Sequence, residues 1–143
     1  MSFFVNQGRL ASLYNVYKEK AEFLIVYQLE AHPSDGITLG ESMIPQHKTI
    51  QEKIDAAKLL VDAVNTETED VATIDIDDAD KIRVVSDDME HTFASIYDCY
   101  LEDVFIIKDG KISMIGSRMV EDTRDPNLIF WMADVVEKWL SSN

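Results

Sequence analysis

Three residues in the first third of the chain carry side chains suited to proton transfer. Glu30 and His32 stand two positions apart, and His47 follows further along the chain. An imidazole can donate or accept a proton near neutral pH, and a neighbouring carboxylate can set its tautomer and its basicity. These residue types are typical of general acid–base chemistry, with His32 as the strongest candidate for the acid. We therefore expect Glu30, His32 and His47 to form a proton-handling site.

Each of these residues also has a structural interpretation that the sequence leaves open. His32 could fix a turn through backbone hydrogen bonds, Glu30 could be a surface charge at the end of a strand, and His47 could be an exposed loop histidine. Asp35 and Gly36 belong to a Pro-Ser-Asp-Gly sequence, for which turn formation is the better explanation. Which interpretation applies to each residue depends on the helix or strand that positions it.

An apolar strand is expected to position Glu30 and His32. The stretch Glu22–Gly36 reads E-F-L-I-V-Y-Q-L-E-A-H-P-S-D-G, and residues 23–27 within it are all apolar or aromatic. A strand of this kind is typical of a parallel sheet that is covered on both faces. Ligands of such sheets bind beyond the carboxyl ends of the strands, so the sequence places Glu30 and His32 where a site is expected.

A helix is expected to position His47. From Ile50 to Val64, apolar residues recur at the spacing that places them on one face of a helix. They are Ile50, Ile54, Ala57, Val61 and Val64. Thr49 and Glu52 have the spacing of a capping box, which predicts that the helix begins between them. His47 then lies just ahead of a helix N-terminus, where the positive end of the dipole disfavours an imidazolium and favours a neutral ring.

The remaining patterns complete an α-β-α-β-α-β-β-α order of elements. They predict a helix over residues 8–20, a strand over 82–86, a helix capped by Asp87 or Asp88, a hairpin of 104–108 and 111–115 around Asp109-Gly110, and a last helix that begins at Asp125-Pro126. This order is that of a thioredoxin-like fold without its first strand. We therefore expect a single α/β domain over residues 1–143, with a central mixed sheet flanked by helices.

The composition argues against several classes of function. A net charge of -14 disfavours binding to nucleic acids and to anionic membrane surfaces, both of which require clustered basic residues. No apolar run is long enough to span a membrane. The single cysteine, Cys99, allows no intrachain disulfide and fits a cytoplasmic setting. The acidic segment 65–81 lacks the glycine and the closing glutamate of an EF-hand, so we expect a solvated loop and neither a metal nor a cofactor.

Four segments resemble the iodothyronine deiodinase family and occur in the family's order. They are Glu22–Gly36, Gln46–Leu60, Val84–Met89 and Phe105–Ile112. The resemblance implies a thioredoxin-like fold and reductive removal of iodide from iodothyronines, with a thiol reductant as co-substrate. It also implies that His32 holds or protonates the phenol ring of the substrate. Glu30 matches a family carboxylate, and His47 matches the second family histidine.

The chain departs from the family pattern at the position of the nucleophile and at two other places. The family's nucleophile, a selenocysteine or cysteine, would fall immediately before Met1. Ile37 stands where the family has tryptophan, and Leu101-Glu102-Asp103 stands where it has Pro-Glu-Arg. We expect a selenoprotein truncated at its N-terminus, with a naturally shortened relative as the alternative. In both cases we expect no deiodination from these residues alone.

Two other functions fit the same sequence. One is a non-catalytic thioredoxin-like module that binds an aromatic ligand or a partner protein, and the other is a thiol peroxidase-like relative. A further resemblance concerns four strand residues that match the segment with which deiodinases dimerise, so a homodimer through them is possible. These residues are Phe23, Leu24, Ile25 and Tyr27, which serve equally well as a simple core strand. Cys99 has acidic neighbours and is expected to be a passive thiol.

Overall fold

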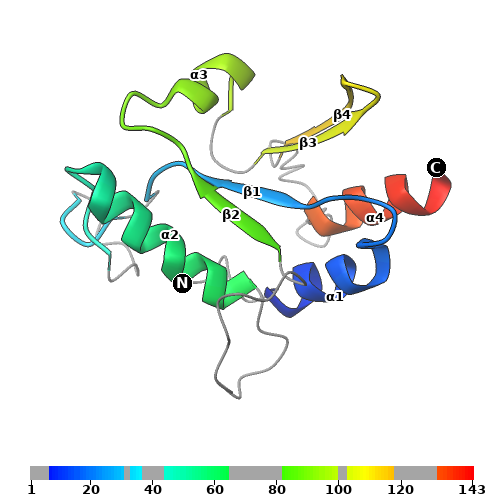
Figure 1. Ribbon diagram of the computed structural model, residues 1–143, viewed down its shortest axis with the longest axis horizontal. Helices are drawn as coiled ribbons and strands as arrows, with labels where there is room; N and C mark the ends of the chain where they lie inside the picture. Colours follow the sequence, from blue (N-terminus) through cyan, green and yellow to red (C-terminus); the bar gives the residue numbers. More distant parts are fainter. Residues whose placement is uncertain (1–6, 31–32, 37–43, 65–81, 100–102, 118–131) are drawn as a thin grey trace, which may run out of the picture. The chain divides into compact units, whose positions relative to one another are not determined.

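The computed structural model describes residues 7–30, 33–36, 44–64, 82–99, 103–117 and 132–143 (Figure 1). The elements are α1 (Gln7–Tyr17), β1 (Leu24–Tyr27), α2 (Ile50–Val64), β2 (Arg83–Ser86), α3 (Thr92–Tyr97), β3 (Asp103–Lys108), β4 (Lys111–Ser117) and α4 (Met132–Ser142). The predicted order of helices and strands is therefore confirmed. The chain divides into two compact units, Met1–Ala94 and Ser95–Asn143.

A parallel pair of strands forms the sheet of the first unit. β1 pairs with β2 in a register that sets Leu24 opposite Arg83 and Tyr27 opposite Ser86. Helix α2, the connection between the two strands, packs along β2 (Figure 1). A helical crossover of this kind is what parallel strands require. Both strands therefore end on the same side of the unit, next to the first turn of α2.

Contacts of α1 tie the start of the first unit to the beginning of β1. The ring of Tyr14 packs edge-to-face on Phe23, with 5.5 Å between centroids and 87° between planes. The helix ends at Tyr17 because the carbonyl of that residue accepts hydrogen bonds from the amides of Lys20 and Ala21, which close a turn. The predicted helix over residues 8–20 was therefore too long at its carboxyl end.

Both aspartates that follow β2 cap α3. Asp87 accepts hydrogen bonds from the amides of Phe93 and Ala94, and Asp88 accepts one from the amide of Thr92. The sequence predicted that one of the two would do so. The helix begins only at Thr92 because residues 87–91 form a turn, in which His91 has a φ of 56°.

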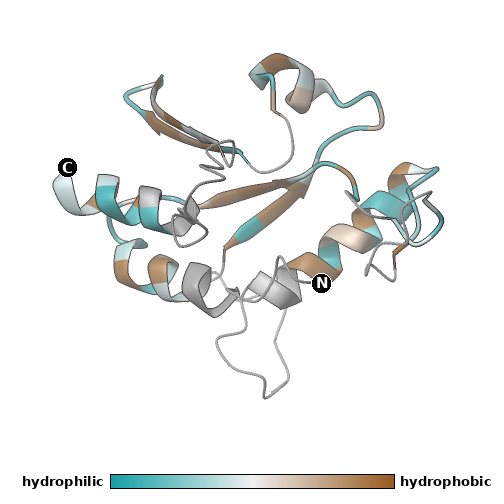
Figure 2. Ribbon diagram, turned by 180° about the vertical axis from the view of Figure 1, so that it is seen from behind, coloured by the Kyte–Doolittle hydropathy of each residue, from teal (hydrophilic) through white to brown (hydrophobic). Residues whose placement is uncertain are grey.

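The second unit contains the end of α3, an antiparallel hairpin and α4. β3 and β4 turn at Asp109 and Gly110, whose φ angles are 53° and 71°. Positive φ at both central residues is the geometry for which Asp-Gly is favoured, so the hairpin prediction is confirmed. Helix α4 contacts both strands. Figure 2 shows apolar strands and a hydrophilic tip in this hairpin. The predicted helix start at Asp125-Pro126 lies outside the described residues.

The α/β class is confirmed, and the predicted single mixed sheet is not found among the described residues. They form two separate two-stranded sheets, one parallel and one antiparallel. A mixed sheet would need a strand that pairs with both, and no described strand does so. The thioredoxin-like arrangement and the single domain stay predictions, and the acidic segment 65–81 lies outside the described residues. Among the helices of the described ranges, none has the length and apolar character to cross a membrane.

Candidate active site

The end of β1 meets the approach to α2 at a cluster of three polar side chains. Tyr27 is the last residue of β1, Glu30 follows it in the chain, and His47 precedes the start of α2 at Ile50. His47 is buried, with 8% of its surface exposed. Tyr27 and Glu30 are partly buried. The interpretation of His47 as an exposed loop histidine is therefore wrong.

The hydroxyl of Tyr27 joins the other two side chains. It donates a hydrogen bond to Oε1 of Glu30 at 2.5 Å, and it lies 2.7 Å from Nε2 of His47. A hydroxyl has one proton to give but can also accept hydrogen bonds. When that proton goes to Glu30, the hydrogen bond with His47 requires a proton on Nε2, which His47 then donates to the Tyr27 oxygen. The three side chains thus form a continuous hydrogen-bonded chain.

The environment keeps Tyr27 protonated. Burial raises the pKa of Tyr27 far above its ordinary value, and the hydrogen bond and the negative charge of Glu30 raise it further. Each of these disfavours a phenolate, because an anion loses hydration in a buried place and is repelled by a carboxylate. Tyr27 can therefore pass a proton along the chain only by receiving another one, and it does not act as a base.

The start of α2 fixes the place of His47. Glu52 accepts hydrogen bonds from the amides of Lys48 and Thr49 at 2.7 Å and 3.2 Å, and the hydroxyl of Thr49 accepts one from the amide of Glu52 at 3.2 Å. This is the reciprocal pattern of a capping box, so that prediction is confirmed. The backbone that leads from His47 into the helix is thereby held in one conformation.

The Pro-Ser-Asp-Gly turn supports the same segment from the other side. Asp35 accepts a hydrogen bond from the amide of Gln46 at 2.7 Å, and the amide of Ser34 donates to the carbonyl of Ile44 at 2.9 Å. The structural interpretation of Asp35 is thus supported, and its carboxylate anchors the residue next to His47. At Gly36 a Cβ would lie 3.1 Å from Cγ of Pro33, so the turn has little room for a side chain.

The structure brings together two of the three predicted site residues and adds one. Glu30 and His47 meet through Tyr27, which sequence reasoning assigned to an apolar run because a strand-end tyrosine does not reveal where its hydroxyl points. His32 lies outside the described residues, and the catalytic roles of all three stay predictions. Within the described ranges, no group of His, Cys, Asp and Glu has the arrangement of a metal site.

The strand expected to form a homodimer is engaged in other contacts at two positions. Phe23 packs on Tyr14, and Tyr27 belongs to the polar cluster, whereas half of the Leu24 surface is exposed. The homodimer through Phe23, Leu24, Ile25 and Tyr27 stays a prediction. Cys99 lies in the second unit and is partly buried.

Comparison with known proteins identifies the family. The sequence model of the family described as iodothyronine deiodinase matches residues 1–132. Thyroxine 5-deiodinase of Ovis aries is 29% identical over 132 residues, which are 91% of this chain and 40% of the sheep protein. The protein of the same name from Sparus aurata is 30% identical over 129 residues, which are 87% of this chain and 43% of that protein.

A third relative, thyroxine 5-deiodinase of Aquarana catesbeiana, is 32% identical over 114 residues, which are 78% of this chain and 37% of that protein. The chain thus spans about 40% of the length of the relatives that it matches. The resemblance seen in the four sequence segments is confirmed by both comparisons. This chain belongs to the iodothyronine deiodinase family.

Proposed function

We propose that this chain is the substrate-binding and proton-handling core of a reductive deiodinase that acts on an iodinated phenol ring, such as that of an iodothyronine. The observation that carries the proposal is the hydrogen-bonded chain of Glu30, Tyr27 and His47 in a member of this family. A partly buried relay of this kind is suited to general acid catalysis.

The reaction itself requires a proton donor. Reductive deiodination replaces a carbon–iodine bond by a carbon–hydrogen bond and releases iodide. Two thiol groups supply the two electrons and become a disulfide, and a proton goes to the ring carbon. General acid catalysis contributes about 10²–10⁴-fold in typical enzymes, so a positioned proton donor is a large part of the rate.

The relay moves a proton from His47 towards Glu30 without charging Tyr27. Once Nδ1 of His47 has taken up a proton, His47 gives the proton of Nε2 to the Tyr27 oxygen while Tyr27 gives its own proton to Glu30, which leaves a neutral imidazole, a neutral tyrosine and a protonated carboxyl. Tyr27 is neutral before and after, as its raised pKa requires. Glu30 stands two positions before His32, so in our proposal the carboxyl supplies His32, which acts as the acid towards the ring.

The thiol or selenol that takes the iodine is a separate requirement. Cys99 is the only cysteine of the chain, so residues 1–94, which hold the relay, contain no thiol. We therefore propose that these 143 residues bind the substrate and release no iodide unless a selenocysteine or cysteine stands ahead of Met1. The same observation favours a second candidate function, a non-catalytic module that binds an aromatic ligand.

An assay of iodide release from thyroxine with dithiothreitol tests the proposal. We expect no release by the chain itself and release by a form with selenocysteine or cysteine directly ahead of Met1. In that form, Tyr27→Phe should lower the rate about 100-fold, because it removes the hydroxyl that links the donor to the acceptor. Tyr17→Phe, on α1 and outside the relay, is the matched control and should leave the rate unchanged.

The other outcomes separate the alternatives. Thyroxine binding by calorimetry without iodide release in either form would favour the binding module. Peroxide consumption by the form with the nucleophile, in place of iodide release, would favour the peroxidase-like function. Release that survives His32→Ala would show that His32 is not the acid.

A further inference from the structure

A buried lysine in the first turn of α2 has no part in the relay. Only 1% of the surface of Lys53 is exposed. Its ammonium nitrogen donates a hydrogen bond to the carbonyl of Asp88 at 2.7 Å, in the turn that follows β2. Burial lowers the pKa of Lys53, while the charges of Asp87 and Asp88 raise it. A buried charge is tolerated only when its partners are fixed, so this contact holds Lys53 in one place.

The turn that receives Lys53 also holds the backbone of Tyr27. The amide of Asp87 donates to the Tyr27 carbonyl at 2.9 Å. The Asp87 carboxylate, itself buried, accepts hydrogen bonds from the amides of Asp88, Phe93 and Ala94 at 2.9–3.1 Å. Asp87 and Asp88 are adjacent. The Asp88 carbonyl that binds Lys53 and the Asp87 amide that binds the Tyr27 carbonyl therefore belong to the same turn.

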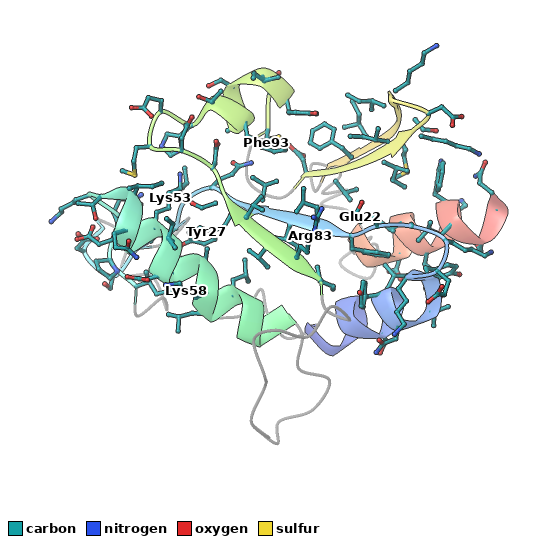
Figure 3. All side chains as sticks on the ribbon, in the orientation of Figure 1. Glu22, Tyr27, Lys53, Lys58, Arg83 and Phe93 are labelled. Carbon is teal, nitrogen blue, oxygen red and sulfur yellow. The ribbon has the colours of Figure 1, made fainter. Side chains whose placement is uncertain are left out.

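These contacts close a ring around the relay. From the hydroxyl of Tyr27 the path crosses to His47 at 2.7 Å and follows the chain through the capping box into α2. From Lys53 it crosses to the turn after β2 at 2.7 Å, and it returns to the Tyr27 backbone at 2.9 Å. Figure 3 shows Lys53 and Tyr27 between α2 and the parallel strands.

We propose that Lys53 is a positioning residue that holds the start of α2 against the end of β1, so that His47 stays within hydrogen-bond distance of Tyr27. Without the ammonium group, the closed path of contacts is broken between α2 and the turn after β2. The hydrogen bond of Tyr27 would then be the contact that must hold His47, and hydrogen bonds weaken steeply once distance and angle are lost. The consequence for catalysis rests on the proposed function, whereas the effect on His47 does not.

The reactivity of His47 towards diethyl pyrocarbonate measures this positioning directly, in the whole chain and without substrate. Modification is followed by mass spectrometry of the peptide that contains His47. In Lys53→Met the apolar stem is kept and the donor is lost, so we expect His47 to react about tenfold faster, equivalent to about 1.4 kcal/mol of lost protection. Lys53→Arg keeps a donor and should stay within about twofold of the natural chain.

Lys58 provides the matched control on the same helix. Its side chain is 67% exposed and pairs with Asp55 at 2.8 Å (Figure 3). Lys58→Met should leave the reactivity of His47 unchanged. Equal rates in Lys53→Met and Lys58→Met would overturn the proposal, and so would equal acceleration by Lys53→Met and Lys53→Arg, because the donor would then not matter.

Two measurements separate positioning from loss of stability and from the proposed function. Urea unfolding shows whether each variant is folded under the labelling conditions. If Lys53→Met is not, Lys53→Gln replaces it, since its shorter amide cannot span the distance to Asp88. In the form with a nucleophile, Lys53→Met should lower kcat for iodide release and leave KM for thyroxine unchanged. Faster labelling of His47 with no change in kcat would contradict the proposed relay and leave the positioning intact.

Discussion

The two sheets of this protein have the same number of strands but are built in opposite ways. The parallel pair of the first unit surrounds itself with buried polar groups, namely His47, Lys53 and Asp87. Among the described residues, the antiparallel hairpin of the second unit buries no polar side chain, and apolar side chains are exposed in both sheets, among them Leu24 and Val85 in the parallel pair and Ile107 and Ile115 in the hairpin. Burying polar groups is costly unless each finds a hydrogen-bond partner, so the first unit depends on exact long-range contacts and the hairpin does not.

The difference follows from how each pair of strands is connected. The hairpin closes through two residues, Asp109 and Gly110, whose conformation is a local property. The parallel pair closes through a crossover that contains α2, and the end of β1 meets the start of that helix. The candidate site lies at this meeting point. A site built there can be disturbed from residues that do not touch it, whereas the conformation of the hairpin turn depends on the two residues that form it.

The largest expected effect in this comparison is that of Asp87→Ala. The substitution leaves two amides at the start of α3 and the amide of Asp88 without their acceptor, and it removes a negative charge near Lys53. We expect a loss of about 3 kcal/mol in the free energy of unfolding, measured in urea by circular dichroism. Asp55→Ala, at an exposed position on α2, should cost less than about 0.5 kcal/mol. Similar losses in the two variants would mean that the turn after β2 is not the anchor described above.

A smaller effect is expected in the hairpin from Gly110→Ala. The glycine has a φ of 71°, and a Cβ there would meet no atom within 4 Å. The cost is therefore conformational, about 1 kcal/mol, and should be seen in urea unfolding together with faster hydrogen exchange over residues 103–117. Asp109→Asn should be close to neutral, since asparagine also suits this turn. A loss above about 3 kcal/mol would show that the tip packs against other parts of the protein.

The smallest effect concerns the acid stability of the first unit. Hydrogen bonds from Thr92 hold the pKa of Asp88 below its ordinary value, with a smaller effect of the charge of Lys53. The folded state thus binds this proton less readily than the unfolded state, so the stabilisation is present above the ordinary carboxyl pKa and is lost as the pH falls through the folded pKa. Asp88→Asn should reduce the fall in Tm between about pH 5 and pH 3. An unchanged fall in Tm would exclude Asp88 as a contributor.

The features that depend on neighbouring residues could be predicted from the amino-acid sequence alone. The order of helices and strands, the Asp109-Gly110 turn and the Thr49–Glu52 capping box were all predicted and confirmed. The family was also evident from four short segments. Each of these signals is complete within a few consecutive residues, because helix caps, tight turns and apolar periodicity are local properties of the chain.

The contacts between polar groups that are distant in the sequence became evident from the folded chain. The contact of Tyr27 with His47 and that of Lys53 with Asp88 join residues 20 and 35 positions apart. Neither leaves a periodic signal, since a tyrosine in an apolar strand and a lysine in a helix look the same whether their polar ends are buried or solvated. The separation of the described strands into two sheets was likewise invisible in the order of elements. Burial, and with it the cost of an unpaired polar group, exists only once the chain is folded.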